Sequence, residues 1–269
     1  MFTQNKFTII IVTRCNLRCK LCCEFVPQNK PFEDIKIEEC ESILKEYFNV
    51  VDFVNTLHLS GGGEPFLHKE LARLIESCMH YTDRFEKLML FTNSTVILSQ
   101  DLIETLTKYK DKIVVQVSHY GIKPELEMKN LEVIRSTGVT VKYLKYYGDD
   151  QYCGGWIDMG DWSERPDSNE ELKAKYSNCA IHCKMLGNWR TRDGKVHICT
   201  RSQRGMELGL MPKFNDDYVD LFDDSSVEDK RNKFIKITES NYINACKYCS
   251  GDWGTDIDSR RYPAAEQMK

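Results

Sequence analysis

Alternating strand and helix patterns over residues 7–146 constrain the fold of this chain more than any other feature. Five apolar runs, rich in β-branched residues, predict buried strands at 7–13, 55–60, 87–92, 111–118 and 140–146. Apolar residues at helical spacing predict intervening helices at 35–48, 68–80, 100–109 and 127–138. This order predicts an α/β fold with a parallel sheet and right-handed crossovers. The pattern allows an open doubly wound sheet or a full or partial barrel.

The segment 147–170 breaks this rhythm, because it is rich in Gly, Asp and Trp and has no clear period. Long irregular connections are often functional, so its carboxylates and ring faces are candidates to hold a substrate. A solvated acidic loop is at least as good an interpretation. The candidates are Asp149, Asp150, Trp156, Asp158, Asp161 and Trp162.

The rest of the chain predicts a smaller and less regular part. We expect a short helix at 170–177 and a hairpin at 188–201, with a tight two-residue turn at Asp193 and Gly194. A loop at 202–225 and a helix at 226–238 follow, before a tail that contains cysteines.

Composition excludes some classes of partner. The 269 residues carry a formal net charge of −4 without a clustered basic run, which argues against nucleic acid. No apolar run approaches the roughly 20 residues that span a bilayer, and the start shows no signal-peptide pattern. We therefore expect a cytoplasmic protein with no membrane partner, and no separate N-terminal domain for a leader peptide.

Twelve cysteines are unusual for a chain with no sign of secretion. In a reducing compartment, clustered cysteines more often bind metal than form disulfides. Cys40 and Cys78 fall within helical patterns, and we interpret them as packing residues. Cys15, Cys19 and Cys22 have the spacing CxxxCxxC directly after the first predicted strand. Three thiolates on one loop can bind three irons of a [4Fe–4S] cube and leave the fourth open to a small molecule.

Two other interpretations of this first cysteine group compete. A zinc site completed by a distant ligand is one, and an electron-transfer ferredoxin is the other. A ferredoxin usually supplies its fourth cysteine nearby, and Cys23 is a poor candidate because it adjoins Cys22.

A glycine run, LSGGGEPFLH at 59–68, follows the second predicted strand. Glycines allow a ligand to approach the backbone closely, and Glu64 offers a carboxylate to an ammonium group. Alone, the run is equally consistent with a plain strand-to-helix turn. Together, CxxxCxxC after the first strand and GGE-P after the second resemble the radical SAM superfamily.

The resemblance implies a partial parallel (β/α) barrel whose first cysteine group holds a [4Fe–4S] cluster that binds S-adenosylmethionine. An external electron donor, such as flavodoxin or ferredoxin, reduces the cluster, and a 5′-deoxyadenosyl radical then abstracts a substrate hydrogen atom. In this chain Leu21 stands where the family often has an aromatic residue against adenine. The implied contacts to S-adenosylmethionine are Gly62, Gly63, Glu64, Thr92, Asn93, Ser94 and Ser118.

The second cysteine group resembles the auxiliary-cluster extension called the twitch domain, the short relative of the SPASM domain. This resemblance implies a closed second [4Fe–4S] site and a division into a core, 1–170, and an auxiliary domain, 171–269. Cys179 is a rival for the first ligand, and a Cys₄ zinc knuckle is the structural alternative. His182 and His197 lie near these ligands in the sequence, and we interpret them as surface residues rather than ligands. The implied ligands are Cys183, Cys199, Cys246 and Cys249.

A closed auxiliary cluster favours electron transfer, so our leading hypothesis is a two-electron oxidation of a small polar or carbohydrate-like substrate. A radical epimerase is the second hypothesis, with Cys153 or Cys179 as the hydrogen donor. Peptide modification is the third. A non-enzymatic zinc or iron–sulfur interaction protein is the alternative from another class.

Overall fold

The computed structural model describes residues 1–152, 156–179, 188–251 and 257–269. Its first part contains all five predicted strands and the four helices between them. In chain order these are β1 (Thr3–Val12), α1 (Ile37–Val50), β2 (Phe53–Gly62), α2 (Leu71–Met79), β3 (Phe85–Thr92), α3 (Gln100–Lys108), β4 (Ile113–His119), α4 (Pro124–Ser136) and β5 (Thr140–Lys145).

The second part contains more regular structure than the sequence pattern predicted. The predicted loop at 202–225 is wrong, because α6 and β8 lie within or overlap it. Helix α6 has no apolar stripe, since polar side chains such as Arg201, Gln203 and Arg204 are buried on it. The elements are α5 (Asn169–Asn178), β6 (Asn188–Thr191), β7 (Lys195–His197), α6 (Thr200–Glu207), β8 (Tyr218–Asp220) and α7 (Val227–Glu239).

The strands form one sheet in the order β5-β4-β3-β2-β1-β6-β7-β8. From β5 to β6 all neighbours are parallel, and the sheet does not close, which confirms a partial barrel. Strands β7 and β8 extend it in antiparallel fashion. Because β6 pairs with β1, the sheet runs across the predicted boundary between 170 and 171.

The hairpin between β6 and β7 differs from the expected two-residue turn. Three residues, Arg192 to Gly194, connect the strands, and only Gly194 among them has a positive φ, of 89°. The Gly194 N–H donates to Thr191 Oγ1 at 2.8 Å. Longer hairpin loops commonly place a single glycine in the left-handed region.

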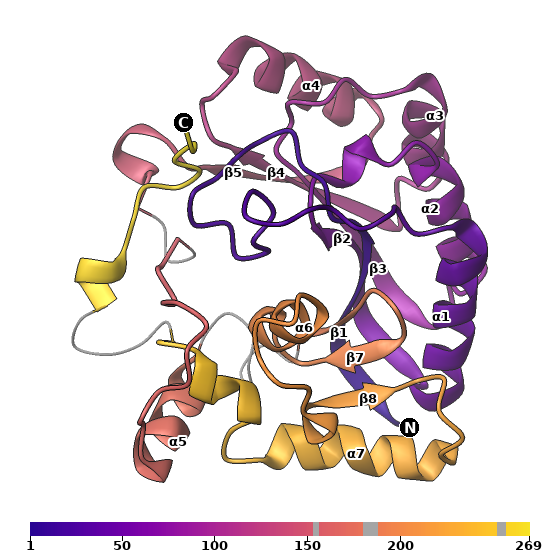
Figure 1. Cartoon of the computed structure of the whole chain (residues 1–269). Coiled ribbons are helices and arrows are strands. Elements are labelled where there is room, and N and C mark those ends of the chain that lie inside the picture. The colour runs from indigo at the N-terminus through magenta and orange to yellow at the C-terminus, as the bar shows by residue number, and fades with distance from the viewer. Residues whose placement is uncertain (153–155, 180–187, 252–256) are drawn as a thin grey trace.

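The core lies between the sheet and its helices. Figure 1 shows α1 to α4 along the outer side of the sheet, with α7 beneath its other end. Phe7 on β1 stacks on Tyr47 of α1, with ring centroids 3.6 Å apart. Cys40 and Cys78 are buried in this core, as expected of packing residues. No helix among the described residues combines the length and apolar character of a membrane span.

Candidate functional site

The carboxyl ends of β1 to β4 lie along one edge of the sheet. Strands β1 and β2 still pair at Val12 and Gly62, and β3 and β4 pair at Thr92 and Val117. Because these strands are parallel, the loops that follow them leave the sheet on the same side. In α/β proteins this is the edge where ligands bind.

Two glycines at the end of β2 allow it to lie against the loop that follows β1. A Cβ on Gly62, whose φ is +75°, would lie 2.3 Å from the Val12 carbonyl oxygen, and one on Gly63 would lie 1.9 Å from that of Arg14. Both positions therefore require glycine. The sequence interpretation attributed the run to the approach of a ligand, but the first approach is that of the chain's own backbone.

The loop after β1 brings Cys15, Cys19 and Cys22 to a cavity of about 180 Å³ at this edge. The pKa of Cys15 is raised to about 12, mainly by burial and also by the charges of Glu64, Cys19 and Cys22. The three thiols are thus close enough to disfavour one another's ionisation. A bound metal reverses this penalty, because coordinating thiols are deprotonated.

Glu64 lies at the floor of the same cavity and is 2% exposed. Its carboxylate accepts hydrogen bonds from Thr92 Oγ1 at 2.8 Å, the Asn93 N–H at 2.7 Å and the Phe66 N–H at 3.1 Å. Burial raises the pKa of Glu64 to about 7, although these three donors lower it. The carboxylate therefore orders the ends of β2 and β3 from below, and its contact with an ammonium group stays a prediction.

The turn after β3 joins the cysteine loop to Glu64. Asn93 Nδ2 donates to Asn16 Oδ1 at 3.0 Å and lies 3.8 Å from Cys15 Sγ. Ser94 has a φ of 58°, and its hydroxyl donates to the Glu127 carbonyl oxygen at 2.8 Å. Thr92 and Asn93 line the cavity, whereas Ser94 supports the turn from behind.

Ser118 at the end of β4 also lines the cavity, and its contact with S-adenosylmethionine stays a prediction. Two aromatic residues line the cavity as well. Tyr120 and Trp156 meet edge to face, with ring centroids 5.7 Å apart. Trp156 comes from the irregular segment that sequence analysis associated with a substrate. Tyr120 was not among the predicted residues, because nothing in its sequence context distinguishes it.

The donor set fits a [4Fe–4S] cluster with one open iron. A [4Fe–4S] cluster spreads its thiolates over separate irons, so the ligands need not converge on one point. Cys15, Cys19 and Cys22 supply three such ligands, and Glu64 and Asn93 supply polar groups beside them.

A buried ion pair ties the cysteine loop to the second part of the chain. Arg190 on β6 donates from Nη1 and Nη2 to the two carboxylate oxygens of Glu24, at 2.7 and 2.8 Å. Arg190 Nε also donates to Gln203 Oε1 at 2.6 Å, and Arg204 Nε donates to the Glu24 carbonyl oxygen at 3.2 Å. Strand β6 and helix α6 therefore fix the end of the loop that begins at β1.

Comparison with known proteins identifies the family. The sequence model of the Radical SAM superfamily matches residues 9–147, which include the first cysteine group and the glycine run. The chain belongs to the radical SAM superfamily. This membership supports a [4Fe–4S] cluster and S-adenosylmethionine as cofactors, and a need for a substrate and a reductant.

Solved structures with bound AdoMet share the fold over all or nearly all of the chain. BtrN in complex with AdoMet (S-adenosylmethionine) and 2-DOIA is 16% identical, with a TM-score of 0.59 over 100% of this chain and 99% of BtrN. The enzyme anSMEcpe with bound AdoMet is 15% identical, with a TM-score of 0.55 over 93% of this chain and 88% of anSMEcpe. Its complex with AdoMet and the Kp18Cys peptide is 15% identical, with a TM-score of 0.55 over 98% of this chain and 93% of that one. Among curated proteins, no relative matches by sequence.

A second cavity of this radical SAM protein, about 370 Å³, adjoins the first cysteine loop. Cys22 and Phe25 line one side, and Asp158 and Trp162 from the irregular segment line the other. Of the remaining acidic candidates, Asp150 instead pairs with Lys145 at 3.1 Å. Two of the predicted substrate residues, Asp158 and Trp162, thus line this second cavity, and its wall is largely apolar.

The second cysteine group collects side chains from three separate elements. Cys179 caps the end of α5, Cys199 precedes α6, and Cys246 and Cys249 lie in and just after η4 (Asn244–Tyr248). Burial raises the pKa of Cys246, and the neighbouring Cys199, Cys249 and Cys179 raise it further. These four thiols are therefore neighbours in space.

Three predicted residues of this region, Cys153, His182 and Cys183, lie outside the described residues. His197 is buried, and its Nδ1 lies 2.9 Å from Ser202 Oγ. Burial lowers the pKa of His197 to about 3, so it packs as a neutral ring. The expectation that His197 is a surface residue is wrong, because its side chain packs inside and the residue is 3% exposed.

Arg201 lies between the second cavity and the four thiols, and it was missed by sequence reasoning. Its guanidinium carbon lies 3.9 Å from the Trp162 ring centroid, and Nε donates to the Tyr248 carbonyl oxygen at 2.7 Å. Burial lowers the pKa of Arg201, whereas the nearby Cys249 and Cys199 raise it. Arg201 Nη1 is buried without a hydrogen-bond partner in the described part of the chain. The only signal in the sequence was the position of an arginine two residues after Cys199.

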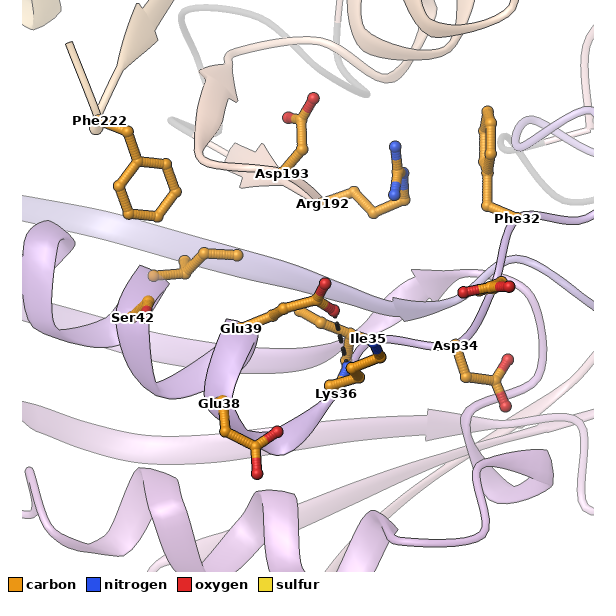
Figure 2. A pocket seen from close by; sticks show the side chains of 12 residues that line it. Phe32, Asp34, Ile35, Lys36, Glu38, Glu39, Ser42, Arg192, Asp193 and Phe222 are labelled. Atoms are coloured by element: carbon orange, nitrogen blue, oxygen red, sulfur yellow. Dashed lines mark hydrogen bonds between the residues drawn. The ribbon is translucent and has the colours of Figure 1, made fainter.

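A larger cavity, about 590 Å³, lies away from both cysteine groups. Figure 2 shows Phe32, Arg192 and Phe222 on one side of it and the first turn of α1, with Lys36 and Glu39, on the other. The Lys36 N–H donates to Glu39 Oε2 at 2.9 Å, which caps the helix. None of the described residues lining this cavity is a cysteine, so we do not assign the chemistry to it.

Proposed function

We propose that this radical SAM enzyme removes two electrons from a small polar or carbohydrate-like substrate, with a second [4Fe–4S] cluster bound by Cys179, Cys199, Cys246 and Cys249. One observation carries the proposal: the 370 Å³ cavity is bounded by Cys22 of the first cysteine group and by Arg201, which lies beside the second group. A substrate there would be within reach of both redox sites.

When bound, the first cluster and S-adenosylmethionine supply a radical that abstracts a hydrogen atom, and a second cluster supplies an acceptor for an electron. An alcohol that becomes a ketone loses one hydrogen atom, one proton and one electron, so the account balances with these two centres. A reductant such as flavodoxin or ferredoxin supplies the initiating electron. The reducing conditions of the cytoplasm suit the thiolate ligands of both clusters.

In this reaction, the residues of this chain bind and orient the substrate. Trp162 offers a ring at the cavity, although Arg201 already covers one face of it. The largely apolar wall excludes water and thereby protects a reactive intermediate. Asp158 is turned back to its own backbone, where Oδ1 accepts from the Gly160 N–H at 2.8 Å.

For the first ligand of the second cluster, we propose Cys179, whereas the sequence analysis favoured Cys183. Cys179 lies near Cys246 and Cys249, which is the reason we now propose it. Lys175 supports this arrangement, because its Nζ donates to the carbonyl oxygens of Cys246 and Cys249 at 3.2 and 2.5 Å and so holds α5 against η4.

Anaerobic reconstitution tests the proposal. We expect about eight irons per chain and formation of 5′-deoxyadenosine from S-adenosylmethionine and dithionite. With a panel of polyhydroxylated ring alcohols deuterated at the carbinol carbon, one ketone should form per deoxyadenosine, and the deuterium should appear in deoxyadenosine. Four irons would remove the second cluster, and zinc with no cleavage would favour an interaction protein.

Two alternative functions predict different outcomes of the same assay. A radical epimerase would incorporate solvent deuterium at a carbon that is not oxidised, with Cys153 as hydrogen donor if Cys179 is a ligand. Peptide modification is favoured by the shared fold of anSMEcpe in complex with the Kp18Cys peptide. A peptide substrate that consumes S-adenosylmethionine, where the ring alcohols do not, would establish it.

A further inference from the structure

The C-terminal segment lies across the first cysteine loop. Two backbone hydrogen bonds of 2.7 Å join residues 18–20 to residues 266–268. Cys19 and Gln267 form the antiparallel bridge between these segments. Figure 1 shows the yellow chain end beside the indigo loop that follows β1. Segments at opposite ends of the sequence therefore share one short piece of β-structure at the cluster site.

Within this bridge, the side-chain amide of Gln267 is aimed at a cysteine sulfur. Its Oε1 accepts from the Arg18 N–H at 2.8 Å, while Nε2 donates to Cys19 Sγ at 3.4 Å and to the Ala265 carbonyl oxygen at 2.6 Å. Because the Arg18 N–H can pair only with an acceptor, the orientation of the amide is fixed and its N–H faces the sulfur.

The hydrogen bond lies in a place where it has a large electrostatic effect. Cys19 is 8% exposed and Ala265 is 4% exposed, so both acceptors of the Gln267 amide are shielded from water, although Gln267 itself is exposed. Cys15 Sγ accepts from the Leu17 N–H of its own loop at 3.4 Å and from Asn93 Nδ2 at 3.8 Å. Cys19 is thus the cysteine of this loop that receives a donor from 248 positions away.

We propose that Gln267 is a positioning residue that sets the reduction potential of the first cluster through its N–H···S hydrogen bond to Cys19. This inference rests on the proposed function in one respect, namely that Cys19 ligates that cluster. Hydrogen bonds to ligand sulfur are among the factors that determine iron–sulfur potentials. A donor stabilises the more negative, reduced state, so its loss lowers the midpoint potential.

The test compares three variants of the full-length reconstituted enzyme by EPR-monitored redox titration. Gln267→Leu and Gln267→Met both remove the N–H donor, and neither adds a charge beside the cluster. In both, the ratio of reduced to oxidised first cluster at a fixed potential should fall about fivefold or more, as expected for one hydrogen bond. Gln28→Leu is the matched control, because Gln28 Nε2 donates to the Lys20 carbonyl oxygen at 2.9 Å on the same loop.

The first cluster is recognised as the signal that changes when S-adenosylmethionine is added. Midpoints equal to wild type in both Gln267 variants overturn the inference, as does an equal shift in Gln28→Leu. If Gln267→Leu assembles no cluster, Gln267→Met still reports the loss of the donor. A wild-type protein without an S-adenosylmethionine-sensitive cluster would instead overturn the proposed function.

Discussion

The two cysteine groups of this radical SAM protein are built in opposite ways. Cys15, Cys19 and Cys22 come from a single loop, and their site also draws on the ends of β2, β3 and β4. The second group is gathered from α5, α6 and η4, and a buried cation, Arg201, lies beside it. A site made by one loop leaves room for a small molecule, whereas four thiols from surrounding elements enclose whatever they bind.

The largest expected difference between the groups concerns cleavage of S-adenosylmethionine. Cys22→Ala should lose about four irons and all deoxyadenosine formation, because only two cysteine ligands of the first cluster remain. Cys249→Ala should also lose about four irons but retain cleavage, while ketone formation stops. Iron analysis and chromatography of deoxyadenosine measure both. Equal loss of cleavage in the two variants would contradict the division of roles.

The next prediction concerns the first ligand of the second cluster, which is either Cys179 or Cys183. Cys179→Ala should behave as Cys249→Ala does, with the second cluster lost and cleavage retained. Cys183→Ala is the matched control, because it removes a thiol four positions away, and it should keep about eight irons. The reverse result, with loss on Cys183→Ala alone, would restore the expectation from the sequence.

The ion pair of Glu24 with Arg190, which joins the first cysteine loop to β6, can be tested by its effect on stability. Glu24→Ala leaves the Arg190 guanidinium buried without its partner, and removal of one member of a buried pair costs about 3 to 5 kcal/mol. Denaturant unfolding of the reconstituted protein measures the loss. The control is Asp216→Ala, since the pair of Asp216 with Lys236 is exposed and should contribute about 0.5 kcal/mol or less. Similar losses in both variants would show that the buried pair does not hold the loop.

The smallest expected effect is a pH dependence that belongs to the open site. The pKa of Glu64 is raised to about 7, so its carboxyl is mostly protonated below that pH and holds Thr92 and Asn93 less firmly. If S-adenosylmethionine binds the ionised form, its affinity should fall by up to about tenfold per pH unit below 7 and stay level above it.

Glu64→Gln is the control for this dependence. Equilibrium dialysis at pH 6 to 8.5 gives the ratio of wild-type to variant affinity, in which titration of the ligand itself cancels. The ratio should decline as the pH falls through 7. A ratio independent of pH would assign the dependence to another group.

The sequence predicted the parts of the molecule that depend on local pattern. The buried strands follow from continuous apolar runs, and the first site follows from cysteine spacing and the glycines after β2. Helix α6 was missed because Arg201, Gln203 and Arg204 are polar yet buried, and their partners lie far away in the chain. The contact of Gln267 with Cys19 was invisible for the same reason. Periodicity reports which face of an element is covered, but it does not report which distant group satisfies a buried polar side chain.

The pairing of Glu24 with Arg190 has a consequence for how the enzyme matures. The two residues are 166 positions apart, and their hydrogen bonds require that β6 has already joined the sheet beside β1. The loop that carries the first three cysteines therefore reaches its final shape only after most of the chain has folded. Delivery of iron and sulfide to that loop is accordingly expected late, onto a nearly complete protein rather than onto a chain still being synthesised.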